Sequence, residues 1–144
     1  AEKVGFKGKV LGIDLQSVDR SFPPQVRVLQ ADLLACNQEL IEVEGPFDLV
    51  LSDMAPKTMG RREVDQARSL ELCQMAGYWA DINLKRGGHF LFKIFQGQEG
   101  DDFIQNLKHK YTKISRLKPK ATRSQSLEVF VLAQNFLGLP NEKQ

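Results

Sequence analysis

The sequence predicts an α/β fold in which a mostly parallel, doubly wound sheet carries helices on both faces. Segments typical of strands and helices alternate along the chain, and the strand segments are apolar on both faces, as in parallel sheets covered by helices. The chain has 144 residues, 42% of them hydrophobic, which is enough for one domain with its own core. No apolar run approaches the about 18 residues that span a bilayer, and no segment resembles a secretion signal.

Three short strands are predicted in the first part of the chain, at Lys9–Asp14, Val26–Gln30 and Phe47–Ser52. Each is mostly apolar and runs into a segment that carries an aspartate. Gly45-Pro46 interrupts the chain before the third strand.

A long helix is expected from about Val64 to Leu84. Its core-facing stripe is formed by apolar residues at helical spacing, namely Leu72, Met75, Ala76 and Trp79. Gly87-Gly88 is expected to end this helix and to start a strand, His89–Phe95.

A second helix is expected after an N-cap at Asp101, with aromatic and apolar residues stacked four residues apart at Phe103, Leu107 and Tyr111. Two strands follow, near Lys113–Leu117 and Leu127–Ala133. We therefore expect a single domain over residues 1–137 and a loose polar tail over residues 138–144.

Acidic residues lie where three of the predicted strands end: Asp14, Asp32 and Asp53. In open α/β sheets, ligands bind beyond the carboxyl ends of the strands, so these carboxylates mark the expected site. Taken singly, Asp14 and Asp32 are equally well explained as loop-capping aspartates. No glycine-rich phosphate-binding turn follows a strand.

Two charges interrupt apolar strands, Lys93 in the segment before Gln96 and Glu128 in the last strand. An unpaired charge inside a protein costs several kcal/mol, so we expect the two side chains to meet, with Asp53 joining them. One interpretation is a structural ion pair. The other is a desolvated lysine held by two carboxylates, which suits proton abstraction or orientation of a hydroxyl.

The formal net charge of +2 conceals a basic stretch without acidic residues, containing Lys108, Lys110, Lys113, Arg116, Lys118, Lys120 and Arg123. The rest of the chain has 13 basic against 18 acidic residues, a net charge of −5. This asymmetry predicts an anion-binding surface, although a solvated helix face would give the same pattern.

The two cysteines, Cys36 and Cys73, are far apart and outside any Cys-x-x-Cys or Cys/His cluster. The sequence therefore favours neither a disulfide scaffold nor a metal site, and a reducing cytoplasm is the expected compartment.

Three segments resemble the FtsJ family of ribosomal RNA 2′-O-methyltransferases, which depend on S-adenosylmethionine. They are Leu51-Ser-Asp-Met-Ala-Pro56 with the following Gly60, Gly87-Gly-His-Phe-Leu-Phe-Lys-Ile-Phe-Gln-Gly97, and Lys118-Pro-Lys-Ala-Thr-Arg-Ser-Gln-Ser-Leu-Glu-Val129. The resemblance runs from about Val4 to Ala133. It implies a Rossmann-like methyltransferase fold.

The resemblance also implies roles for the anomalous charges. The family has a Lys-Asp-Lys-Glu tetrad, in which Asp53 matches the aspartate, Lys93 the second lysine and Glu128 the glutamate. In the family the second lysine takes the proton from the target ribose hydroxyl. Asp14 matches the residue that holds the cofactor ribose, Asp32 the residue near the adenine, and Asp53 also lies beside the methionyl end.

The first tetrad lysine and the glycine-rich cofactor turn have no counterpart in this sequence. We expect the chain to lack the family's amino-terminal helix, central first strand and glycine loop, and to be a fragment or the ordered part of a longer protein. Loss of a central strand would leave two sheet halves with unpaired edges. The activity of the chain by itself stays open on this basis.

The resemblance further implies that the substrate is a uridine of large-subunit (23S) ribosomal RNA, presented on an assembled particle, and we expect the enzyme to be a monomer. Its phosphates would be held by the basic residues Arg61, Arg62, Lys108, Lys110, Lys118, Lys120 and Arg123. The alternatives are a non-enzymatic RNA-binding or ribosome-assembly module, a methyltransferase acting on a base or a protein side chain, and a dinucleotide oxidoreductase. The second is disfavoured because Asp53-Met-Ala-Pro56 stands where base methyltransferases often carry Asn-Pro-Pro-Tyr or Asp-Pro-Pro-Tyr.

Overall fold

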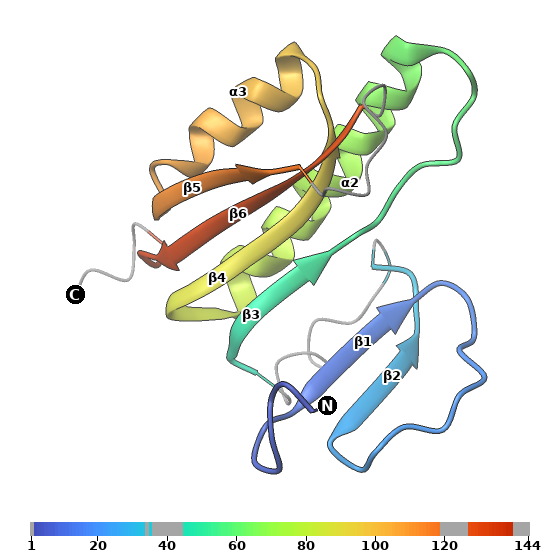
Figure 1. The fold of residues 1–144 in the computed structure, drawn as a ribbon, viewed down its shortest axis with the longest axis vertical. Coiled ribbons are helices and arrows are strands. Elements are labelled where there is room, and N and C mark those ends of the chain that lie inside the picture. Colours follow the sequence, from blue (N-terminus) through green and yellow to red (C-terminus); the bar gives the residue numbers. More distant parts are fainter. Residues whose placement is uncertain (1, 34, 36–44, 119–126, 140–144) are drawn as a thin grey trace. The chain divides into compact units, whose positions relative to one another are not determined.

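The computed structural model describes residues 2–33, 35, 45–118 and 127–139 (Figure 1). The chain divides into two compact units, Ala1–Glu44 and Gly45–Gln144, and each is described by itself. Among the described residues, no helix is both long and apolar enough to cross a membrane.

The first unit contains two parallel strands, β1 (Val10–Asp14) and β2 (Val26–Gln30). They pair in register from Val10 opposite Val26 to Asp14 opposite Gln30. None of the described residues of this unit is fully buried.

The second unit contains a four-stranded sheet in the order β3-β4-β6-β5. Its strands are β3 (Phe47–Ser52), β4 (Leu84–Phe95), β5 (Tyr111–Leu117) and β6 (Glu128–Phe136). β3 and β4 are parallel, whereas β6 runs antiparallel to both of its neighbours. The α/β class is confirmed, and the sheet is mixed rather than mostly parallel. The described strands form two sheets, one of two strands and one of four.

Two helices cover one face of the four-stranded sheet: α2 (Arg62–Asn83) and α3 (Gln98–Leu107). The first agrees with the predicted helix to within two residues at its start. Its inward stripe is displaced from the prediction, since Ala76 and Trp79 are buried as expected but Leu72 and Met75 are only half-buried. The fully buried positions include the small or polar residues Ser69, Cys73 and Ala80.

The predicted boundaries around α3 and β4 are corrected by the structure. Helix α3 begins at Gln98, so Asp101 lies in its first turn rather than at its N-cap. Tyr111 begins β5 instead of continuing the helix, because an aromatic residue at this spacing suits both structures. Strand β4 begins at Leu84, directly after α2, and includes the two glycines. The tail is described only to Leu139, which packs against the core.

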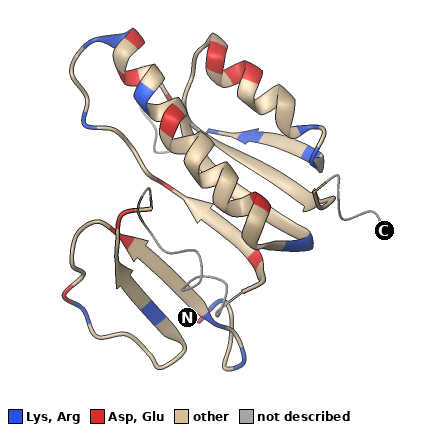
Figure 2. Ribbon diagram, turned by 180° about the vertical axis from the view of Figure 1, so that it is seen from behind, with Lys and Arg blue, Asp and Glu red and all other residues tan. Residues whose placement is uncertain are grey.

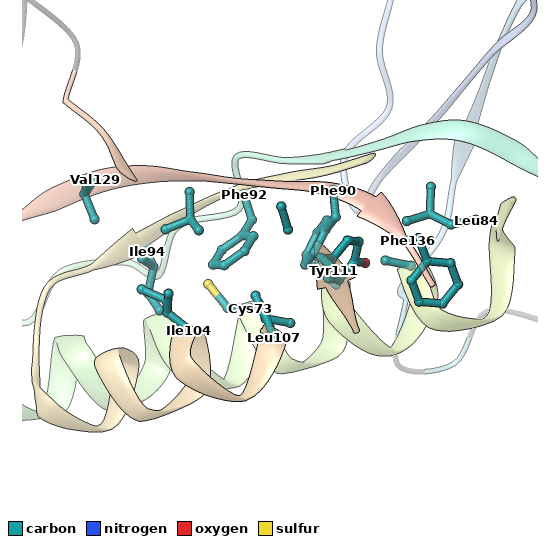
Figure 3. Packing of buried hydrophobic residues seen from close by; sticks show 14 residues of the cluster. Cys73, Leu84, Phe90, Phe92, Ile94, Ile104, Leu107, Tyr111, Val129 and Phe136 are labelled. Carbon is teal, nitrogen blue, oxygen red and sulfur yellow. The ribbon is translucent and has the colours of Figure 1, made fainter. Parts of the chain in front are cut away.

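The core of the second unit lies between the sheet and the two helices (Figure 3). Alternate residues of β4, namely Phe90, Phe92 and Ile94, face the helices and are almost completely buried. On β3, Leu49 and Leu51 are 46% and 63% exposed, so burial on both faces is wrong for this strand. The physical reason is that the described helices of the unit pack on the same side.

Candidate active site

Lys93 and Glu128 lie together on the sheet face opposite the helices. In the antiparallel register, Lys93 is opposite Phe130 and Phe95 is opposite Glu128, so the two charged residues are diagonal neighbours. Long side chains can span this separation on one face of a sheet. The distance between Lys93 Nζ and Glu128 Oε1 is 3.9 Å, an ion pair. The structure thus brings together the two charges that the sequence singled out.

The pair is less buried than the sequence led us to expect. The side chain of Lys93 is 18% exposed and that of Glu128 is 42% exposed. Glu128 is the first residue of β6, at the end of the sheet and on the face that the helices leave uncovered. At this exposure the pair contributes about 0–1 kcal/mol to stability, so the fold gains little from it.

Asp53 follows the last residue of β3. Ser52 is opposite Phe92 in the parallel register, so the next residues along the two chain segments are Asp53 and Lys93. Its side chain is exposed and has no hydrogen bond or ion pair with another described residue. Asp53 is therefore at the same sheet edge as Lys93, but the expected contact with the Lys93–Glu128 pair is not formed.

In the first unit, Asp14 ends β1 and Asp32 comes two residues after β2. Both are exposed at the carboxyl end of a parallel strand pair. Asp14 Oδ1 accepts the backbone N–H of Gln16 at 2.9 Å, which is the loop-capping contact anticipated as an alternative. A carboxylate has about four acceptor positions, so Asp14 retains capacity for the paired hydroxyls of a ribose. The chemistry of Asp14 therefore suits the ribose hydroxyls of a nucleoside.

A set of polar side chains on α2, which the sequence did not predict, binds the carboxyl end of β4. Ser69 Oγ accepts the backbone N–H of Phe95 at 2.9 Å, and Cys73 Sγ donates to the carbonyl of Lys93 at 3.1 Å. One turn earlier, Gln66 Nε2 donates to the carbonyl of Gln96.

A related contact holds the loop after β3, because the buried carboxylate of Asp65 accepts the N–H of Met59 at 2.8 Å. Asp65, Ser69 and Cys73 recur every four residues along a helix, so they lie on one face. This spacing was visible in the sequence as a polar line on a helix predicted to face the core.

Burial sets the chemistry of Cys73. Desolvation raises the pKa of its thiol to about 12, and the hydrogen bond with Ser69 opposes this shift only in part. The thiol therefore stays protonated near neutral pH and keeps the hydrogen that it donates to Lys93.

The predicted basic residues are placed in several parts of the second unit (Figure 2). Arg61 and Arg62 are exposed at the start of α2, where a positive charge is unfavourable to the helix dipole. Lys108 and Lys118 are exposed, whereas the Lys110 ammonium is paired with Asp81. Lys120 and Arg123 lie outside the described residues.

Within the described part of the chain, no group of three or more His, Cys, Asp or Glu side chains is arranged to hold a metal ion.

The fold is that of a methyltransferase. A ribosomal RNA methyltransferase from Plasmodium falciparum has a crystal structure that matches 96% of this chain and 78% of its own, with a TM-score of 0.81 and 24% sequence identity. A methyltransferase from Streptococcus mutans, solved in complex with SAH, matches with a TM-score of 0.53, 10% identity, and coverage of 89% and 72%. At these identities the likeness concerns the fold.

The chain belongs to the FtsJ-like methyltransferase family, whose sequence model matches residues 1–136. It is 41% identical to a protein of Oleidesulfovibrio alaskensis named ribosomal RNA large subunit methyltransferase E, over 97% of this chain and 69% of the relative. A protein of the same name from Syntrophobacter fumaroxidans is 44% identical, over 94% and 70%. The family predicted from the three sequence segments is confirmed.

Proposed function

We propose that this protein transfers a methyl group from S-adenosylmethionine to a ribose 2′-hydroxyl of large-subunit ribosomal RNA, with a uridine as target. The observation that carries the proposal is the Lys93–Glu128 pair at the carboxyl end of β4, in a chain of the FtsJ-like family. The names of the relatives support the choice of RNA. We further propose that the enzyme is a monomer, because both members of the pair come from one chain. We also propose that it acts on the ribosomal particle in the cytoplasm, since the relatives are named for ribosomal RNA.

When bound, S-adenosylmethionine would supply a methyl group on a sulfonium sulfur, from which a neutral thioether departs readily. Asp14 and Asp32 are proposed to hold its ribose and adenine, and Asp53 its methionyl end. The remaining task of the protein is to align the nucleophile and remove its proton, and alignment can supply roughly 7–11 kcal/mol of the barrier.

Lys93 is proposed to orient the ribose hydroxyl and, in its unprotonated amine form, to receive the hydroxyl proton as the oxygen bonds to the methyl carbon and the bond from that carbon to sulfur breaks. The ammonium that results is stabilised by Glu128, whose carboxylate lies 3.9 Å from the amine. Asp53 at the end of β3 adds negative charge at the same sheet edge. This accounts for a lysine and two carboxylates at a site where the fold gains little stability from them.

The RNA backbone is proposed to contact Arg61, Arg62, Lys108, Lys118, Lys120 and Arg123, and also Lys110, whose ammonium is paired with Asp81. The placement of two arginines at the amino end of α2 supports this, because they disfavour the helix and are available to an anion. Such contacts orient RNA without reading its sequence.

The test is methyl transfer from labelled S-adenosylmethionine to ribosomal RNA, followed by digestion and mass spectrometry of the nucleosides. We expect the label on a ribose, and a loss of about 10²–10⁴ in rate for Lys93→Ala with RNA affinity unchanged. A label on a base, or an unchanged rate in the variant, would contradict the proposal. RNA binding without any transfer would favour the assembly module instead.

A further inference from the structure

On one side of β4, the pairing with the neighbouring strand β3 stops just before Lys93, although β4 continues to Phe95. The last pair between β3 and β4 is Ser52 with Phe92, and β3 stops there. On the opposite side, β4 remains paired to β6 through Glu128, and the N–H of Gln96 donates to the carbonyl of Leu127 at 2.8 Å. Residues 93–95 therefore form the end of β4 and, among the described strands, pair only with β6.

Backbone groups of successive residues in a strand point to alternate sides. Since Gln96 faces β6, the carbonyl of Lys93 and the N–H of Phe95 face the side that β3 has vacated. In the structure both groups are occupied by α2, through the Cys73 thiol and the Ser69 hydroxyl. Two helix side chains thus take the place of a neighbouring strand at Lys93 and Phe95.

Both helix residues suit this task. Each is only 2% exposed, so water does not compete for the backbone groups. The thiol remains protonated at neutral pH and is a permanent donor. The hydroxyl of Ser69, one helical turn from Cys73, accepts the N–H of Phe95 while α2 keeps its helical backbone.

We propose that Ser69 and Cys73 are positioning residues of the methyl-transfer reaction, which fix the backbone at the Lys93 carbonyl and two residues later at the Phe95 amide, and so set the direction of the Lys93 amine. This inference rests on the proposed role of Lys93. Neither residue is proposed to touch substrate or cofactor. A lysine placed on a strand end with one free edge would otherwise vary in position, and misplacement by about 1 Å can cost about 100-fold in rate.

The first experiment uses nuclear magnetic resonance and needs no activity. In Ser69→Ala, we expect the Phe95 amide to exchange with solvent about fivefold to tenfold faster. We also expect the side-chain resonances of Lys93 to shift. The matched control is Ser115→Ala on β5, a serine with no side-chain hydrogen bond to another described residue, which should leave both signals unchanged. An unchanged Lys93 signal in Ser69→Ala would overturn the inference.

The second experiment separates positioning from stability. We expect kcat for methyl transfer to fall about tenfold to 100-fold in Ser69→Ala, with KM for RNA unchanged. Ser69→Thr keeps the acceptor and should restore kcat. Cys73→Val keeps the shape, removes the donor and should lower kcat as well. Ile104→Val in α3 provides a core variant with lowered Tm and full activity.

Loss of kcat in Ile104→Val equal to that in Ser69→Ala would overturn the inference, since stability would then explain the effect. An inactive wild-type protein would contradict the proposed function. The resonance of Lys93 in Ser69→Ala would still decide whether α2 positions its side chain. The two failures are therefore distinguishable.

Discussion

The two units of the chain differ in how they maintain a site. In Gly45–Gln144 the strand that carries Lys93 lies over a core of aromatic and aliphatic side chains and is bound by α2 at its end. In the Ala1–Glu44 unit, Asp14 and Asp32 follow two parallel strands in which no described residue is fully buried. A two-stranded sheet without a core is marginal in water. The proposed catalytic groups thus lie on strands with a core, whereas the proposed cofactor carboxylates follow strands whose described residues are at most half-buried.

The largest effect is expected from equivalent truncations in the two units. Phe92→Ala removes a fully buried ring from β4 and should cost about 3–5 kcal/mol of unfolding free energy. Val28→Ala on β2 removes a half-buried side chain and should cost about 1 kcal/mol or less. Denaturant titration followed by Trp79 fluorescence measures the first directly. Equal losses of unfolding free energy in the two variants would contradict this difference between the units.

Cys73 sharpens the comparison by reporting how closely the second unit is packed. With a pKa of about 12 against an ordinary value of 9.0, the folded protein should contain roughly a thousandfold less thiolate at pH 8. In a Cys36→Ser background, alkylation of native Cys73 should therefore be slower than in denaturant by about that factor. Rapid alkylation under native conditions would mean that the core opens readily.

The raised pKa of Cys73 also makes the stability of the folded protein depend on pH. Because the folded state favours the protonated thiol, its contribution to stability is complete below about pH 9. It is lost as the pH rises toward 12, by about 1.4 kcal/mol per pH unit. Cys73→Val should flatten the alkaline decline measured by denaturant titration. A decline of the same slope in the variant would assign it to other groups.

The smallest effect concerns Tyr111, whose buried hydroxyl lacks a hydrogen-bond partner among the described residues. Burial raises the pKa of this phenol, and the nearby Asp81 raises it further. Tyr111→Phe should be neutral or stabilising by up to about 1 kcal/mol, because removal of an unsatisfied polar atom costs nothing. Tyr78→Phe on the exposed face of α2 is the control, and a clear loss of stability in Tyr111→Phe alone would reveal a partner for the hydroxyl.

The sequence was informative where chemistry conflicts with pattern. A lysine and a glutamate in apolar strands predicted a contact, and the antiparallel register of β4 and β6 forms it. Strand ends at Asp14 and Asp53 followed from local hydropathy. The strand ends depend on residues close together in the chain, whereas the contact was inferred from the free-energy cost of an unpaired buried charge.

Other features depended on tertiary structure. The exposure of Glu128 depends on which sheet face the helices cover, and a strand pattern that is apolar on both faces does not specify this. The hydrogen bonds made by Ser69 and Cys73 depend on β3 ending opposite Phe92, three residues before the end of β4. The start of β5 at Tyr111 was missed because an aromatic residue four positions after Leu107 continues a helical stripe equally well.

The account makes Lys93 and Glu128 one functional unit, and a double-mutant cycle on the single-turnover rate of methyl transfer tests this most directly. Lys93→Ala, Glu128→Gln and the double variant are compared with the wild type under saturating RNA. Since Glu128 is proposed to act through the lysine amine, the double variant should be no slower than Lys93→Ala. Rates that fall independently, so that the double variant loses the product of the two single effects, would contradict the account.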